Sequence, residues 1–421
     1  MIRVLFIVGT RPEAIKLAPV ILHQKARPHQ FNVSVCATGQ HRGLLDQVLQ
    51  LFGISPEFDL DVMRPGQTLC QSSARILAGL EEAIAAADPN MVVVQGDTTS
   101  TLCGALAAFY RKIPVAHVEA GLRTGDVKQP FPEELNRVLT TRMASLHFAP
   151  TQSARRNLIR EGCEPESVLL TGNSGIDAVL TVSRRLAAGE LKSSVATELD
   201  KSKKLILVTA HRRENFGASL ENICSALGQL AGRTDIQIVF PVHPNPEVQK
   251  ASREILGGLP NVRLVDPLSY IDFVALMRRA YLLVTDSGGV QEEATSLGKP
   301  MLLLREKTER MEGVLAGNVR IVGTCTRKIF RHATELLENE GAYSAMARAQ
   351  NLYGDGNASE RICQGIRRYF GHKCVPVQGS AVRWFGLGNL QPLASLTQQM
   401  TRAIVAWTRR FTPADASRVN W

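Results

Sequence analysis

Aromatic residues, long apolar runs and stretches of one charge are all scarce in this sequence. Aromatic residues make up 5% of the chain, which leaves few side chains on which nucleic-acid bases could stack. The lysines and arginines form no run of about five, as a nucleic-acid-binding arm would. No apolar run reaches the roughly 18 residues of a membrane-spanning helix. We therefore expect neither nucleic-acid binding nor a membrane span.

Patterns for disulfides, metals and nicotinamide cofactors are also missing. The 8 cysteines form no CxxC pair, which is typical of reduced thiols in a cytoplasmic protein and not of a zinc site. Gly9 follows an apolar run but lacks the GxGxxG continuation of a dinucleotide site. The apolar N-terminus runs into Thr10, Arg11 and Pro12 without a signal-peptide cleavage pattern. We expect a cytoplasmic protein that uses no metal and no cofactor.

What the chain does contain is a regular alternation of short apolar runs with helical spacings. The apolar runs lie at residues 4–8, 32–37, 91–94 and 114–118, and again at 204–209, 236–242, 262–265, 281–285 and 301–304. Such runs, separated by helices, are typical of parallel sheets covered on both faces. The length of 421 residues suits two domains, and the net charge of +10 suits a polyanionic small substrate. The predicted fold is α/β, with two doubly wound Rossmann-like domains facing each other across a cleft.

Composition also predicts the domain boundaries. The first domain covers residues 1–190 and the second residues 200–355, with a stretch rich in Ala, Ser, Lys and Glu between them. We expect residues 356–372 to form a helix that returns to the first domain, followed by an extra tail at 373–421. Apolar residues recur in the tail at steps of three and four, which predicts a helix that covers its own domain or docks on a partner.

Charged residues follow the predicted strands of the first half. Arg11 and Lys16 lie in a strand–turn–helix segment, which suits an anion at a helix N-terminus but also fits a purely structural turn. Asp97 follows a later strand, either as a helix N-cap or as a site residue. Glu119 ends an apolar strand, where packing gives no reason for a charge. Glu133 lies four residues before an arginine on a predicted helix, so the two form either a solvated ion pair or part of a site.

The second half carries patterns that suit phosphate binding. His211 closes its first strand and precedes two arginines, and His243 has a similar position after the next strand. Gly288 and Gly289 follow a strand, where glycines let the backbone approach a diphosphate at a helix N-terminus. Glu293 lies in the helix that follows and could bond ribose hydroxyls.

Taken in order over about residues 1–370, these motifs resemble the non-hydrolysing UDP-N-acetylglucosamine 2-epimerases, which share their fold with GT-B glycosyltransferases. The resemblance implies catalytic roles for Asp97, Glu119, Glu133, Arg137 and His211. It implies binding of UDP and the adjoining sugar by Arg11, Lys16, His211, Phe273, Ser287, Gly288, Gly289, Glu293 and Arg310. Members of the family are activated by a second substrate molecule, and the candidates for that site here are Gln40, His41, Arg212 and His243. The family also implies a homodimer.

The implied reaction is the reversible inversion of C2 between UDP-N-acetylglucosamine and UDP-N-acetylmannosamine. The C2 proton is poorly acidic, because C2 is not next to a carbonyl. The family's route avoids a free carbanion by eliminating UDP to give a 2-acetamidoglucal, to which UDP then re-adds. A role in bacterial surface polysaccharide synthesis fits. The alternatives are an epimerase of a UDP-2,3-diacetamido sugar, a GT-B glycosyltransferase, a hydrolysing 2-epimerase and a non-catalytic UDP-sugar sensor.

Overall fold

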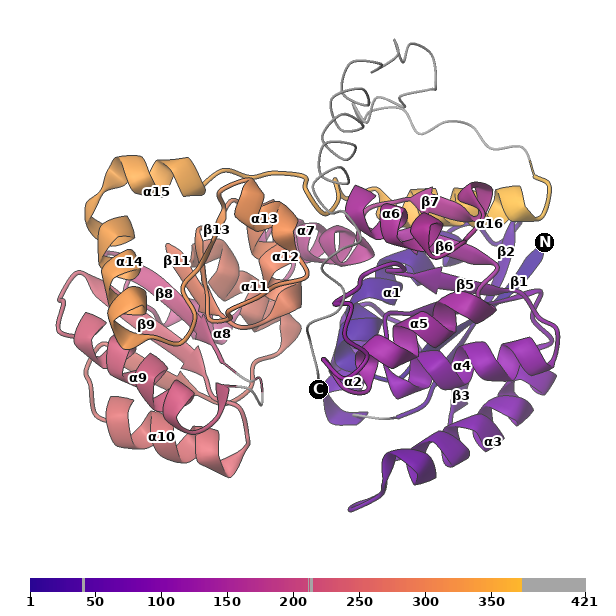
Figure 1. The fold of residues 1–421 in the computed structure, drawn as a ribbon, viewed down its shortest axis with the longest axis horizontal. Helices are drawn as coiled ribbons and strands as arrows, with labels where there is room; N and C mark the ends of the chain where they lie inside the picture. Colours follow the sequence, from indigo (N-terminus) through magenta and orange to yellow (C-terminus); the bar gives the residue numbers. More distant parts are fainter. Residues whose placement is uncertain (40–41, 211, 213–214, 373–421) are drawn as a thin grey trace, which may run out of the picture. The chain divides into compact units, whose positions relative to one another are not determined.

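Two parallel sheets with connecting helices form the structure, a computed structural model that describes residues 1–39, 42–210, 212 and 215–372 (Figure 1). The first sheet has the strand order β3-β2-β1-β4-β5-β6-β7. Its strands are β1 (Ile2–Val8), β2 (Phe31–Ala37), β3 (Phe58–Asp59), β4 (Met91–Gln95), β5 (Val115–Val118), β6 (Leu146–Ala149) and β7 (Val168–Leu170). The helices of this half are α1 (Arg11–Lys25), α2 (Arg42–Leu51), α3 (Leu69–Ala87), α4 (Thr99–Tyr110), α5 (Glu133–Met143), α6 (Gln152–Arg160) and α7 (Ser174–Ala187).

The second sheet has the strand order β10-β9-β8-β11-β12-β13. Its strands are β8 (Lys204–Thr209), β9 (Ile236–Pro241), β10 (Val262–Val265), β11 (Leu282–Thr285), β12 (Met301–Leu303) and β13 (Val319–Ile321). The helices of this half are α8 (Ser194–Thr197), α9 (Ala218–Leu230), α10 (Pro246–Leu256), α11 (Tyr270–Arg279), α12 (Gly288–Ser296), α13 (Met311–Leu315), α14 (Thr326–Glu338) and α15 (Glu340–Met346). The predicted α/β fold with two Rossmann-like sheets is confirmed.

Strand β1 shows why residues 4–8 are apolar without interruption. Val4, Phe6 and Val8 contribute to a core that includes residues of α1 and α7. Leu5 and Ile7 contribute to another core, which includes residues of α3 and α4. Because both faces of the strand are buried, every position needs an apolar side chain.

The last described helix, α16 (Ala358–Tyr369), packs against α1, α7 and β6 of the first half (Figure 1). Its N-terminal amides at Ala358 and Ser359 donate hydrogen bonds of 3.2 and 2.7 Å to the carboxylate of Asp177 in α7. An acidic side chain at this position complements the partial positive charge of a helix N-terminus. Glu360 lies 2.6 Å from the His23 ring of α1, which adds a second contact to the same half. The predicted tail at 373–421 lies outside the described residues.

The cysteines of the described residues are all free thiols, at positions 36, 70, 103, 163, 224, 325 and 363. Burial raises the pKa of Cys36 and that of Cys363 to about 12, so neither thiol supplies a nucleophile at neutral pH. Among the helices that the structure describes, none is both long and apolar enough to cross a membrane.

The loop after β5 requires a left-handed backbone at Gly121, where φ is 91°. A Cβ atom at this position would lie 2.3 Å from the carbonyl oxygen of Ala154. Gly121→Ala is expected to lower the free energy of unfolding by roughly 3 kcal/mol, because the left-handed conformation and the overlap each cost about 1–2 kcal/mol. Gly125 is a matched control, since its φ is 82° and no atom lies within 4 Å of its Cβ position. Urea denaturation should find Gly125→Ala clearly less destabilised, and equal losses would contradict this account.

Candidate active site

Glu119 is the centre of a buried cluster of charges. It follows β5 directly, is 8% exposed and has a φ of 64°, which is rare for a residue with a long side chain. Its carboxylate oxygens lie 2.6 and 2.7 Å from the Lys16 Nζ of α1. Asn173 donates a further hydrogen bond of 3.0 Å, and Gln95 donates another. Burial alone would raise the pKa of Glu119, but the charges of Lys16 and Arg310 outweigh it and lower this pKa.

Arg310 brings the second half of the chain into the same cluster. It precedes α13 and is 8% exposed. Its Nε donates to Glu292 at 2.5 Å, its Nη2 lies 3.8 Å from Glu119, and its Nη1 pairs with Glu309. The backbone carbonyl of Arg310 accepts a hydrogen bond of 3.2 Å from the Tyr353 hydroxyl. Burial opposes the charge, but the nearby carboxylates raise the pKa of Arg310, so the side chain stays cationic.

Asp97 does not cap a helix. The N-cap of α4 is Thr98, whose hydroxyl accepts a 3.1 Å hydrogen bond from the Thr101 amide. The Asp97 carboxylate instead forms an ion pair with Arg137 of α5. The interpretation of Asp97 as an N-cap is therefore wrong, because the helix begins one residue later than that role requires.

The alternative of a solvated ion pair between Glu133 and Arg137 is also wrong. Arg137 is 7% exposed, and besides Asp97 it contacts Glu134 at 3.3 Å. Glu134 also accepts hydrogen bonds of 3.0 and 3.1 Å from backbone amides of the preceding loop. Within the described part of the chain, Glu133 forms no ion pair, and it lines a cavity.

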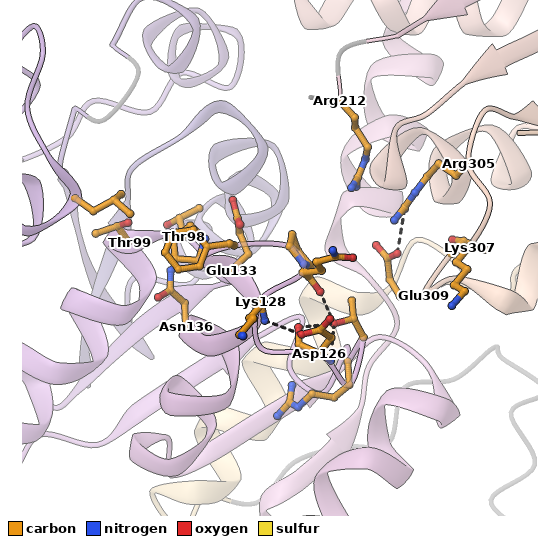
Figure 2. Close-up of a pocket in the computed structure, with 18 of the residues that line it drawn as sticks. Thr98, Thr99, Asp126, Lys128, Glu133, Asn136, Arg212, Arg305, Lys307 and Glu309 are labelled. Carbon is orange, nitrogen blue, oxygen red and sulfur yellow. Dashed lines mark hydrogen bonds and ion pairs between the residues drawn. The ribbon is translucent and has the colours of Figure 1, made fainter. Parts of the chain in front are cut away.

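This cavity has a volume of about 1170 Å³ and is lined by loops of both sheets. Figure 2 shows Thr98, Glu133 and Asn136 from the first half around it. The second half contributes the lining residues Arg212, Arg305, Lys307, Thr308 and Glu309. Arg305 pairs with Glu309 at 3.0 Å. A space of this size with cations on its wall suits a ligand as large and as anionic as a nucleotide sugar.

The two glycines at the start of α12 have different surroundings. A Cβ atom at Gly288 would lie 2.6 Å from Nη1 of Arg310, so this glycine makes room for the guanidinium group. The position at Gly289 has no atom within 4 Å and leaves the backbone open to a ligand. Ser287 is the N-cap residue of α12, and its side chain makes no capping bond. Gly288 thus accommodates the Arg310 side chain, and the role of both glycines at a diphosphate stays a prediction.

Tyr270, which is buried, forms a second group beside the cluster with Glu293 and Arg11, which are partly buried. The Tyr270 hydroxyl donates a 3.0 Å hydrogen bond to Glu293, and burial raises the pKa of Glu293 to about 7. Burial lowers the pKa of Arg11, although the charge of Glu293 opposes the shift. Nη1 of Arg11 donates to the backbone carbonyl of Leu268 at 2.9 Å. Phe273, on the same helix as Tyr270, is partly buried against the core.

Candidates for the activating site are only partly described. The Arg212 amide donates a 2.9 Å hydrogen bond to the Asp286 carboxylate, and its side chain lines the cavity. Nδ1 of His243 accepts a 3.2 Å hydrogen bond from the Asn245 amide, and its ring centroid lies 6.4 Å from that of Phe216. The candidates at positions 40 and 41 lie outside the described residues, and so does the catalytic and UDP-binding candidate at position 211.

Three polar residues of this region escaped sequence analysis. Glu292 was hidden because its neighbour in the helix carries the recognised motif. Asn173 follows β7, whose three residues are too few to show a strand pattern. Glu13 is 1% exposed and accepts hydrogen bonds from the Gly9 amide and the Thr98 hydroxyl at 3.1 and 2.9 Å. Glu13 thereby ties the loop after β1 to the loop that carries Asp97.

Two buried histidines predict a pH dependence of stability. His117 and His147 are paired across β5 and β6, and burial lowers their pKa values to about 3 and about 4. An unfolded histidine titrates near 6.5, so below this pH the unfolded chain binds more protons than the folded one. The stabilisation is present above pH 6.5 and is lost as the pH falls, at about 1.4 kcal/mol per pH unit for each histidine.

His147→Leu should therefore flatten this dependence between pH 6.5 and 5. We expect the slope of unfolding free energy against pH to fall by roughly 1 kcal/mol per unit relative to the unsubstituted protein, in urea denaturation. The two proteins are compared because Glu293 opposes the effect of the histidines. Its pKa is raised to about 7, so its contribution to the free energy of unfolding increases as the pH falls. Identical slopes in both proteins would show that His147 does not carry the effect.

Comparison with known proteins agrees with the fold. Residues 23–367 match the protein family UDP-N-acetylglucosamine 2-epimerase. A relative in Escherichia coli K12, named UDP-N-acetylglucosamine 2-epimerase, is 51% identical over 370 residues, which cover 87% of this chain and 98% of the relative. The crystal structure of the Neisseria meningitidis UDP-GlcNAc 2-epimerase bound to UDP-GlcNAc has a TM-score of 0.83 and 43% identity, covering 87% of this chain and all (100%) of that one. The Methanocaldococcus jannaschii enzyme, in complex with UDP-GlcNAc and UDP, has a TM-score of 0.74 and 34% identity, covering 87% and 99%. The chain therefore belongs to the UDP-N-acetylglucosamine 2-epimerase family.

Proposed function

We propose that this chain is an enzyme that reversibly inverts C2 of UDP-N-acetylglucosamine to give UDP-N-acetylmannosamine. The observation that carries the proposal is the buried cluster in which Glu119 contacts Lys16 at 2.6 Å and lies 3.8 Å from Arg310. An acid–base group and two cations for a diphosphate thus stand together, one cation from each half of the chain. The family membership and the substrate named for the relatives support the same reaction.

The proposed chemistry is an elimination followed by an addition. A carboxylate takes the C2 proton as the bond between C1 and the UDP oxygen breaks, which gives a 2-acetamidoglucal and UDP. UDP then re-adds to C1, while C2 receives a proton from the opposite face of the ring. Lys16 and Arg310 stabilise the negative charge that develops on the departing diphosphate. No free carbanion forms, because the electrons of the C–H bond become the C1–C2 double bond.

Three carboxylates of the first half supply the acid and the base in this proposal. Glu119 lies in the charge cluster, Asp97 is held by Arg137, and Glu133 faces the cavity. Proton transfer from two faces of the sugar requires at least two such groups. The family resemblance adds His211 to this set.

Contacts to the rest of the nucleotide are proposed from the second half. The phosphates are assigned to the accessible backbone at Gly289, to the Ser287 side chain, which makes no capping hydrogen bond, and to Arg11. Glu293 is assigned to the ribose and Phe273 to uracil. We further propose a cytoplasmic homodimer that serves surface polysaccharide synthesis, and a second substrate site around Arg212, His243, Gln40 and His41, all on the family resemblance.

Proton NMR of the purified protein with UDP-N-acetylglucosamine in D₂O tests the proposed reaction. A new UDP-N-acetylmannosamine signal, with deuterium at C2 of both isomers, is the expected result. Free N-acetylmannosamine and UDP would instead indicate a hydrolysing enzyme. An unchanged spectrum would contradict the proposal and favour a diacetamido substrate or a glycosyltransferase.

A further inference from the structure

The cations assigned to the diphosphate are already paired with carboxylates inside the protein. Lys16 lies 2.6 Å from Glu119, and its side chain is 16% exposed. Arg310 lies 2.5 Å from Glu292 and is also paired with Glu309. A diphosphate that binds both cations therefore enters next to carboxylates that hold them already.

Glu292 is a carboxylate of this cluster to which the proposed reaction gives no role. It lies in the middle of α12 and is 3% exposed. The Asn173 side chain bridges the two halves, because its Nδ2 donates both to Glu292 at 2.5 Å and to Glu119 at 3.0 Å. Glu119 and Glu292 thus share two partners, the Asn173 amide and the Arg310 guanidinium.

The two carboxylates respond to this shared environment in opposite directions. Burial raises the pKa of Glu292, Arg310 opposes the shift, and the charge of Glu119 raises it further. The pKa of Glu119 stays lowered, because Lys16 and Arg310 outweigh its burial. Among the described residues, the charged or titratable groups that interact with the pair include Lys16, His117, Glu293, Arg310 and Tyr353. Glu309 pairs with Arg310. Two buried carboxylates that share one cation titrate as a coupled pair, so one of them takes up a proton when that cation is drawn away.

We infer that Glu119 and Glu292 form a proton-sharing pair, which takes up one proton from solvent when a diphosphate binds Lys16 and Arg310. The inference rests on the proposed binding of UDP at these cations. The diphosphate competes for both cations and adds negative charge at short range, so one carboxylate of the pair becomes a neutral carboxylic acid. The proton adds to a carboxylate oxygen, and Glu292 provides the buried site that makes this possible.

Isothermal titration calorimetry with UDP at pH 8.5 tests the inference. Titrations in buffers of different ionisation enthalpy count the protons that accompany binding. We expect an uptake of about one proton per UDP, and an association constant that falls up to about tenfold per pH unit. This pH lies above the second pKa of a phosphate, near 6, so UDP itself contributes little. UDP that binds without proton uptake would overturn the inference while leaving the proposed function intact, whereas no binding of UDP would contradict both.

Two adjacent glutamates of α12 provide matched variants. Glu292→Gln should still bind UDP but reduce the proton count to near zero. Glu293→Gln should weaken UDP binding and leave the count unchanged, because Glu293, with a pKa of about 7, is already ionised at this pH. An unchanged count in Glu292→Gln would show that another group takes the proton. The titration of the unsubstituted protein decides the main point by itself if either variant fails to fold.

Discussion

Glu119→Gln is expected to slow epimerisation by about 10²–10⁴-fold, the usual contribution of a general acid or base. The amide keeps the shape of the carboxylate but neither accepts the C2 proton nor carries its charge. Exchange of the C2 hydrogen with D₂O should fall by the same factor, because the proposed route requires removal of that proton. The measurement is the initial rate of both processes by NMR. Exchange that persisted while epimerisation was lost would assign Glu119 to the second proton transfer only.

This substitution also removes one partner of a buried ion pair, so its effect on folding must be separated from its effect on catalysis. Lys16 would remain buried beside a neutral amide, at an expected cost of roughly 3 kcal/mol in unfolding free energy. The double variant Lys16→Met/Glu119→Gln removes both charges and should recover part of this stability. It should not recover activity. A double variant that regained turnover would indicate that the single variant was merely misfolded.

Arg310→Met should produce the largest loss of stability of any single substitution in this cluster, about 3–5 kcal/mol. The buried guanidinium pairs with Glu292 and Glu309 and lies 3.8 Å from Glu119, so its removal leaves neighbouring buried carboxylates without their common counter-ion. Urea denaturation at pH 8 should show the loss clearly. At lower pH the loss should shrink, because protonation of the carboxylates replaces the missing charge.

A double-mutant cycle isolates the origin of this loss. Adding Glu292→Gln to Arg310→Met removes one of the stranded carboxylates and should restore roughly 1–2 kcal/mol. Additive losses in the two substitutions would mean that Glu292 and Arg310 do not interact as the 2.5 Å contact indicates.

The parts of the fold that sequence predicted are those in which burial alone determines the residue type. Strand β8 was predicted with its exact bounds, residues 204–209, because its four central residues are buried and apolar. Strand β6 was missed, since its four residues include a histidine and its extent depends on pairing with β5. Pairing with a neighbouring strand depends on the tertiary structure, so a few consecutive residues of sequence do not reveal it.

The residues of the candidate site also divide into those that the local sequence indicated and those that it did not. Glu119 was found because a charge at the end of an apolar strand is conspicuous. Asn173 and Glu292 were not, because nothing in their local sequence indicates that these residues, 119 positions apart, contact each other. The partner of Arg137 was likewise wrong, since helical spacing suggested Glu133 and the folded loop presents Asp97 instead.

The contacts of Tyr353 determine whether the two halves of this protein could be exchanged independently. Its hydroxyl bonds to Arg310 and to the Gly313 amide, while its own carbonyl accepts a 2.6 Å hydrogen bond from Asn173. Tyr353, in the segment that leads to α16, thus contacts the start of α13 in one half and the N-cap residue of α7 in the other. A chimera that exchanged the second half with that of a relative would have to exchange this segment too. The site therefore depends on both sheets and on the segment around Tyr353, and these parts would have to be exchanged together.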